Sequence, residues 1–247
     1  MNDVRYLKKI LVFTALSVCL TGCNNSLDET TAEAEAKGVT VEYVEKEEIT
    51  EQPIADKSEL YEDIDDTSVI KMYLTVSSGN EADGTNHTWK EINTYSAYDY
   101  EDMGVDRYKV DGVLQIDEGD GIGADSFGYG VDIPNVSVQV RGQSSSKALY
   151  KNYKVRIKEG KGSFRDQRTL NLNKHPEDPY RFINKLSYTL MKDIPHLVGG
   201  RTQFVNLYVC DTTAGGSGVY EDYGLYTMVE QTNKKYLKSR GFDDNGL

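Results

Sequence analysis

The chain has 247 residues, of which 40 are acidic and 28 basic, so its formal net charge at pH 7 is −12. This negative charge argues against a nucleic-acid partner, because contacts with phosphates need clustered Lys and Arg. Three Cys and three His argue against a dense disulfide framework and against a His-rich metal centre. The length is sufficient for one large domain or two small ones with a core of their own.

The chain begins with features of an export signal, which we predict over residues 1–22. Three basic side chains are followed by the apolar run 10–20, which is too short for a membrane span but fits a signal peptide. The run ends in Leu20–Cys23, which resembles the lipobox of bacterial lipoproteins. This resemblance implies that Cys23 is acylated and anchors the mature protein to the lipid membrane, on the extracellular face of the cell. An ordinary secretory signal with a chance cysteine is the alternative.

An acidic segment follows and is predicted to be a disordered tether over residues 23–66. Its positions 24–66 carry 15 acidic and 3 basic residues, a net charge of −12. Such a segment repels itself and has too little apolar surface to offset the entropy of ordering. A spacer off the membrane is the favoured interpretation, with a calcium-binding or partner-binding arm as the alternative. Residues 67–247 then carry a net charge of only about −2 and are predicted to fold.

Alternating apolar and polar residues predict a series of short strands in the first half of the folded part. A further short element surrounds Trp89, the only Trp of the chain. The segment 117–126 is rich in Gly and Asp, but it lacks the ligand spacing of an EF-hand and is expected to be an exposed turn. The strands are expected at 69–76, at 108–116 with a break at Asp111-Gly112, at 136–141, at 152–158 and at 170–173.

A helix is predicted over 179–193, with Asp178 as its N-cap and Pro179 in the first helical position. Its apolar residues Phe182, Leu186 and Leu190, joined by Ile183, are four apart and are expected to be buried. Two strands at 204–209 and 224–229 follow, and then a short helix that is capped by Thr232, runs to Ser239 and stops at Gly241. The order of elements predicts an α+β fold with a mostly antiparallel sheet.

The turn between the third and fourth strands is the segment most suggestive of chemistry. Arg141-Gly-Gln-Ser-Ser-Ser-Lys147 supplies hydroxyls and backbone N–H groups, and Lys151 comes at the start of the returning strand. A Gly/Ser turn beside a lysine can bind phosphates. Lys151 shares its side of the strand with Tyr153, whereas Lys154 points the other way. A lysine on the core-facing side needs an anion. From these residues alone, a structural hairpin is the favoured interpretation and a nucleotide site is the alternative.

Several segments in the same order resemble the N-terminal part of the spore coat protein H (CotH) kinase family, over about residues 67–247. The resemblance implies a divergent protein-kinase-like fold, truncated before the larger lobe, that uses ATP with Mg or Mn to phosphorylate secreted, surface or coat proteins. The segments are Arg141–Ser146, Lys151–Tyr153, the helix from Arg181 to Asp193, Phe204–Val209, Tyr223–Glu230 and Phe242–Leu247.

The resemblance also implies roles for individual residues. The turn with Arg141, Gly142, Ser144 and Ser145 would cover the phosphates of ATP. Lys151 would contact these phosphates, with Lys154 as the second choice, and the helix 179–193 would orient this lysine, although no acidic partner is found inside that helix. Glu230 would be a ribose or hinge contact, or simply a capping residue.

The resemblance further implies that catalytic and metal-binding acids belong to a larger lobe, which would follow the last residue, Leu247. We therefore expect no catalytic residue and no metal ligand in this chain, and we expect the chain alone to be inactive, since positioning by metal and acid carries most phosphoryl-transfer catalysis. The alternative is a non-catalytic surface binding or adhesion module on the same fold. Carbohydrate binding is a third possibility, which would need exposed aromatic platforms.

Overall fold

The structure, a computed structural model, describes residues 67–192, 194 and 197–245. The predicted signal peptide, Cys23 and the acidic tether lie outside the described residues. Within these ranges, every helix is too short or too polar to span a bilayer. Cys210 is a free, buried thiol.

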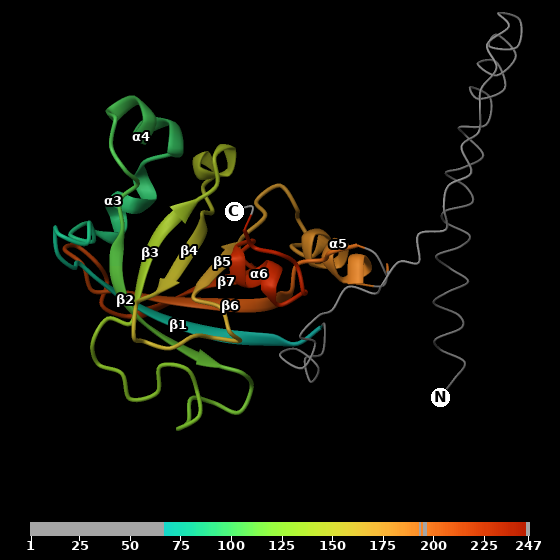
Figure 1. Cartoon of the computed structure of the whole chain (residues 1–247). Helices are drawn as coiled ribbons and strands as arrows, with labels where there is room; N and C mark the ends of the chain where they lie inside the picture. The colour runs from blue at the N-terminus through green and yellow to red at the C-terminus, as the bar shows by residue number, and fades with distance from the viewer. Residues whose placement is uncertain (1–66, 193, 195–196, 246–247) are drawn as a thin grey trace, which may run out of the picture. The chain divides into compact units, whose positions relative to one another are not determined.

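Seven strands form a closed barrel in the order β1-β2-β3-β4-β5-β7-β6 (Figure 1). All neighbouring pairs are antiparallel except β1 and β6, which run parallel. The prediction of an α+β fold with a mostly antiparallel sheet is therefore confirmed, while the parallel closure was not predicted. The strands are β1 (Val69–Ser77), β2 (Val110–Asp117), β3 (Val136–Arg141), β4 (Asn152–Ile157), β5 (Thr169–Asn173), β6 (Thr202–Asp211) and β7 (Tyr220–Val229).

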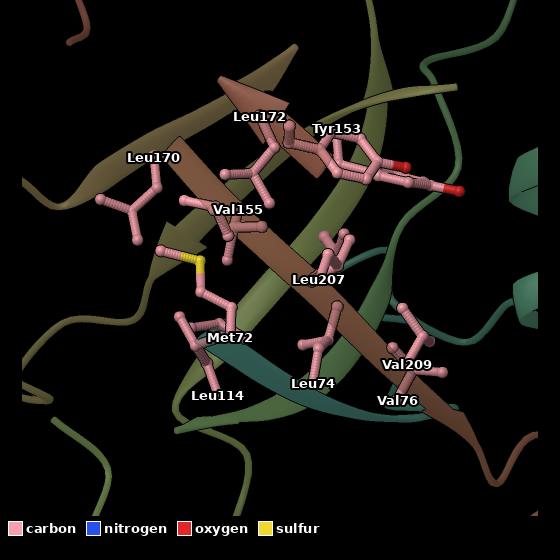
Figure 2. Packing of buried hydrophobic residues seen from close by; sticks show 14 of the residues in the cluster. Met72, Leu74, Val76, Leu114, Tyr153, Val155, Leu170, Leu172, Leu207 and Val209 are labelled. Carbon is pink, nitrogen blue, oxygen red and sulfur yellow. The ribbon is translucent and has the colours of Figure 1, made fainter. Parts of the chain in front are cut away.

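The core fills the inside of the barrel, because alternate residues of each strand point inward. Figure 2 shows such side chains from several strands packed together, among them Met72, Leu74 and Leu207. Met72 and Leu74 are fully buried, and Leu207 is 1% exposed. This apolar interior holds the rim of the barrel, where the candidate residues lie, in a fixed position.

Strand β2 is continuous, so the predicted break at Asp111-Gly112 is wrong. Gly112 pairs with Val76 of β1 and with Val136 of β3. A Cβ at this position would lie 3.0 Å from a side-chain carbon of Leu74 and 3.1 Å from a backbone oxygen. The glycine is therefore needed for close packing between strands and not for a turn.

Two short helices, α3 (Trp89–Thr94) and α4 (Ala97–Met103), precede β2 and lie together in Figure 1. Each begins with a capping box, in which the N-cap hydroxyl and the acidic side chain three residues later satisfy each other's backbone N–H. The element around Trp89 was predicted, whereas α4 was not. Its sequence has no apolar period, and its signal was the pair Ser96 and Asp99.

Helix α5 (Ile183–Lys192) begins four residues later than predicted. Asp178 still acts as a cap, because its carboxylate accepts hydrogen bonds from the backbone N–H groups of Tyr180 and Ile183. The expected burial of the apolar face is wrong: Leu186 and Leu190 are 44% and 50% exposed, and Lys185 is the buried residue. Helical periodicity located the apolar face but could not show what would cover it.

The last helix, α6 (Lys234–Lys238), is close to its predicted position but has a different cap. Asn233, and not Thr232, accepts the hydrogen bond from the backbone N–H of Tyr236. Gly241 has a positive φ of 75° beyond the end of the helix, as a stop residue requires.

Candidate functional site

The predicted turn joins β3 to β4 and contains a short 3-10 helix, η2 (Ser144–Lys147). Gly142 adopts a φ of +90°, and a Cβ there would lie 2.0 Å from the hydroxyl oxygen of Ser145. Only glycine fits this position without strain. Asn152 donates from its amide nitrogen to the Ser145 hydroxyl at 3.0 Å, which fixes the turn to the first residue of β4.

Lys151 directs its ammonium group toward this turn. The Nζ atom donates to the backbone oxygen of Ser146 at 2.6 Å, and the side chain is half-buried just before β4. Burial lowers the pKa of Lys151, while the charge of Asp99 acts in the opposite direction. An ammonium has three donor hydrogens, so this one could also donate to an anion beside the turn.

The acid that acts on Lys151 comes from α4 and not from the helix that was expected to orient it. Asp99 accepts a hydrogen bond from the backbone N–H of Ser96 at 2.6 Å. This bond lowers the pKa of Asp99, to which the charges of Lys147 and Lys151 also contribute. The backbone N–H of Ala97 in the same helix donates to the Ser146 hydroxyl at 2.8 Å. Helix α4 therefore contacts the turn directly.

The predicted serines and Lys151 open on two different cavities, which share the loop 147–152. Ser144 and Ser145 line a cavity of about 710 Å³, together with Asn152, His175 and Asn184. Lys151 instead lines a second cavity of about 450 Å³. The sequence pattern placed these groups side by side but could not show that the loop separates them.

Five aromatic side chains contribute to the wall of the second cavity. Trp89 stacks on Tyr153 with ring centres 5.0 Å apart, and its Nε1 donates to the hydroxyl of Tyr223 at 2.9 Å. Tyr150 and Tyr226 complete the aromatic wall. We call this space the aromatic cavity. Two lysines, Lys90 and Lys151, and one acid, Asp222, also line it. Flat aromatic walls with ammonium groups suit a ligand that has both a ring and a negative charge.

Further cations gather at the same end of the barrel. Arg141 donates to the side-chain oxygen of Asn173, and burial lowers the pKa of Arg141. Lys174, the residue after β5, donates to the backbone oxygen of Tyr223. Arg181 donates to the backbone oxygen of Lys174 at 2.6 Å. Lys174 had not been predicted as a site residue, because nothing in its sequence neighbourhood marks it as buried beside the turn.

The two remaining candidates do not join this cluster. Lys154 lies on β4 and points to the opposite side of the strand from Tyr153, as the alternation predicted. It pairs in register with Gln139 of β3 and Asn171 of β5. Glu230 follows the end of β7, where Val229 pairs with Asn171. The β4–β5 register places Tyr153 opposite Leu172, so Lys151 and Glu230 lie toward opposite ends of β5.

Glu230 forms ion pairs with two arginines. Its carboxylate is fully buried, with one oxygen 2.9 Å from Arg201 Nη1 and the other 2.7 Å from Arg240 Nη2. It also accepts a hydrogen bond from the backbone N–H of Arg201 at 3.1 Å. This geometry fits a structural ion-pair network and leaves no oxygen directed at the turn.

The donors at this end of the barrel fit a phosphate better than they fit a metal ion. Positive side chains, hydroxyls and a glycine turn suit phosphate oxygens. In residues 67–192, 194 and 197–245, no three His, Cys, Asp or Glu side chains come together in a way that could hold a metal ion. Asp117, which begins the Gly/Asp loop, uses its carboxylate to accept hydrogen bonds from the N–H groups of Gly119 and Gly121.

Comparison with known protein families agrees with the resemblance inferred from the sequence. The family model described as CotH kinase protein matches residues 138–247. The predicted resemblance is therefore confirmed for this part of the chain, which begins within β3 and contains every candidate residue of the turn, Lys151, Lys154 and Glu230. Residues 67–137, with β1, β2, α3 and α4, lie outside the matched segment. No curated protein matches the chain.

Proposed function

We propose that this protein is a CotH-like kinase-domain protein whose barrel binds ATP. The phosphates would lie at the aromatic cavity, where Lys151 would donate to them, and the turn that contains Gly142, Ser144 and Ser145 would lie next to this cavity and hold the ammonium in place. The observation that carries this proposal is the position of the Lys151 ammonium, 2.6 Å from a backbone oxygen of the turn and at the wall of the aromatic cavity. The match to the kinase family supports the same conclusion.

The chemistry expected of these groups is binding and orientation. An ammonium and several N–H and O–H donors can hold a polyphosphate in one geometry, which is a large part of what phosphoryl transfer requires. The described residues do not supply a metal site, so the divalent cation, Mg²⁺ or Mn²⁺, would be held by the phosphates of the nucleotide.

We further propose that the protein works on the extracellular face of the cell membrane. Acylated Cys23 would anchor it, the acidic segment 23–66 would hold the barrel away from the lipid surface, and secreted or surface proteins would be the substrates. Metabolic labelling of cells with a palmitate analogue tests the anchor: the wild-type chain should be labelled and sedimented with membranes, and the Cys23→Ala variant should not. Labelling of both forms would refute the anchor without affecting the ATP proposal.

Calorimetric titration of the full chain with ATP and Mg²⁺ tests the proposed function. We expect Lys151→Ala to weaken binding by at least about tenfold, or about 1.4 kcal/mol, because it removes a charge-assisted hydrogen bond to a phosphate. Lys154→Ala is the matched control, since it removes the same charge from β4 on the other side of the strand, and it should bind as the wild type does. Equal affinity of the wild type and Lys151→Ala would overturn the assignment of this lysine.

A second candidate is a non-catalytic surface binding module on the same barrel. The exposed apolar face of α5, with Leu186 and Leu190, favours it, because large exposed apolar patches often mark interaction sites. The same titration separates the two functions. A well-folded wild-type chain that binds no ATP would favour the binding module.

A further inference from the structure

Lys174 is a buried cation for which the described part of the chain provides no counter-ion. The residue is 7% exposed, and its ammonium donates to the backbone oxygen of Tyr223. Among residues 67–192, 194 and 197–245, no carboxylate lies within ion-pair distance of it. A buried charge is costly unless an anion and further hydrogen bonds compensate for it. This position therefore has an unmet requirement for a negative charge.

The groups around the Lys174 ammonium do not meet this requirement. Tyr226 presents its ring 4.4 Å away and Tyr150 presents its ring 5.9 Å away, which are weak cation–π contacts. Arg181 is a second positive charge nearby, and Asp222 acts only at a distance. The Asp222 carboxylate instead accepts hydrogen bonds from Asn206 and from the backbone N–H of Gly224.

Lys174 is also connected to the proposed phosphate turn. Its backbone N–H donates to the side-chain oxygen of Asn152 at 2.6 Å, and the amide nitrogen of Asn152 donates to the Ser145 hydroxyl. Its ammonium lies against Tyr223 and Tyr226, which line the aromatic cavity together with Lys151. Asn152 therefore connects Lys174 to the turn, and Tyr223 and Tyr226 connect it to the aromatic cavity.

Tyr150 covers this cation and a second one. Its ring lies 5.9 Å from the Lys174 ammonium and 5.5 Å from the Arg181 guanidinium carbon, while the residue is 54% exposed. Because Tyr150 is exposed, its ring has room to change rotamer beside the Lys174 ammonium.

We propose that Lys174 is a second phosphate-binding cation of the site, which donates to an anionic oxygen of the nucleotide when Tyr150 turns aside. This inference rests on the proposed ATP-binding function. It adds a second cation to the site, at the end of β5. Burial lowers the pKa of Lys174 to about 8, with Arg181 adding to the effect and Asp222 opposing it. The contribution of this group to binding should therefore fade within an accessible pH range.

The experiment is a titration of the full chain with ATP, tripolyphosphate and adenosine at several pH values. With the pKa of free Lys174 at about 8, its contribution should fall about tenfold between about pH 7 and about pH 9. Lys174→Arg keeps its charge throughout this range and should remove that part of the pH dependence. Lys174→Met should bind ATP and tripolyphosphate at least about tenfold more weakly, and adenosine unchanged.

The outcomes separate this inference from the proposed function. If Lys151→Ala loses ATP binding but Lys174→Met and Lys174→Arg behave as the wild type does at every pH, the role of Lys174 is refuted and the proposed function stands. If the wild type does not bind ATP, the proposed function fails, and the tripolyphosphate titrations alone decide whether Lys174 binds an anion. Should Lys174→Met fail to fold in a thermal melt, the pH profile of Lys174→Arg decides the question.

Discussion

The ion-pair network of Glu230 allows its role to be tested. A structural role predicts a loss of stability when Glu230 is replaced, whereas a role as a nucleotide contact predicts a loss of ATP binding. The carboxylate accepts hydrogen bonds from Arg201, Arg240 and Gln167, and the two arginines are 5% and 4% exposed. Glu230→Ala removes the buried carboxylate that both guanidinium groups share. Breaking a buried ion pair in this way costs about 3–5 kcal/mol, so we expect a loss of that size in the free energy of unfolding.

Urea unfolding followed by circular dichroism measures this loss. Glu159→Ala is the matched control, since Glu159 is an exposed glutamate in a turn, and it should change the free energy of unfolding by less than about 0.5 kcal/mol. Glu230→Gln keeps the shape of the side chain and should cost less than Glu230→Ala. If Glu230→Ala unfolds at the wild-type urea concentration but no longer binds ATP, Glu230 is a nucleotide contact, and the structural interpretation is refuted.

Three further variants test other parts of the structure. Gly142→Ala should lower the free energy of unfolding by more than about 1 kcal/mol in the same assay, because φ is +90° and a Cβ would meet a serine hydroxyl at 2.0 Å; an unchanged midpoint would contradict the turn geometry. Leu190→Ala should cost less than about 1 kcal/mol, against about 2–5 kcal/mol for the buried Leu207→Ala, and equal losses would mean that α5 is covered. The hydrogen bond from the backbone N–H of Gly119 lowers the pKa of Asp117 in the folded state. The ionised carboxylate therefore stabilises the fold above the unfolded pKa of about 3.9, and this stabilisation is lost as the pH falls through the lower folded pKa. Thermal melts of Asp117→Asn in acid should therefore show a flatter pH dependence than the wild type, and identical profiles would contradict this.

The strands could be predicted from the sequence because each carries its own signal. Alternation in Val136–Arg141 and Asn152–Ile157 follows from a sheet with one buried face, and the structure places strands β3 and β4 there. Closure of the barrel depends on pairing β1 with β6, whose partners are more than a hundred residues apart in the chain. No local pattern encodes such a pairing, so the parallel contact and the closed topology could not be predicted.

Side-chain environments were harder to predict than strand positions. A glutamate after a strand has the same sequence signal whether it contacts a ligand or pairs with buried arginines, and only the fold brings Arg201 and Arg240 to Glu230. In the same way, Lys174 has no motif, and its burial follows from the packing of Tyr150 and Tyr226 around it. Long-range packing, and not composition, decides which charges are buried.

Asp99, the acid whose charge raises the pKa of Lys151, lies outside the segment that the family model matches. Asp99 and the Ala97 N–H that holds Ser146 both belong to α4, which precedes the segment matched by the CotH family model. The turn and the lysine belong to the matched segment, so their resemblance could be found from sequence alone. Their support comes from a helix that the family pattern does not cover. The electrostatic surroundings of Lys151 therefore depend on residues outside the matched segment, and a substitution in α4 should alter the affinity of the turn for an anion without changing any residue of that segment.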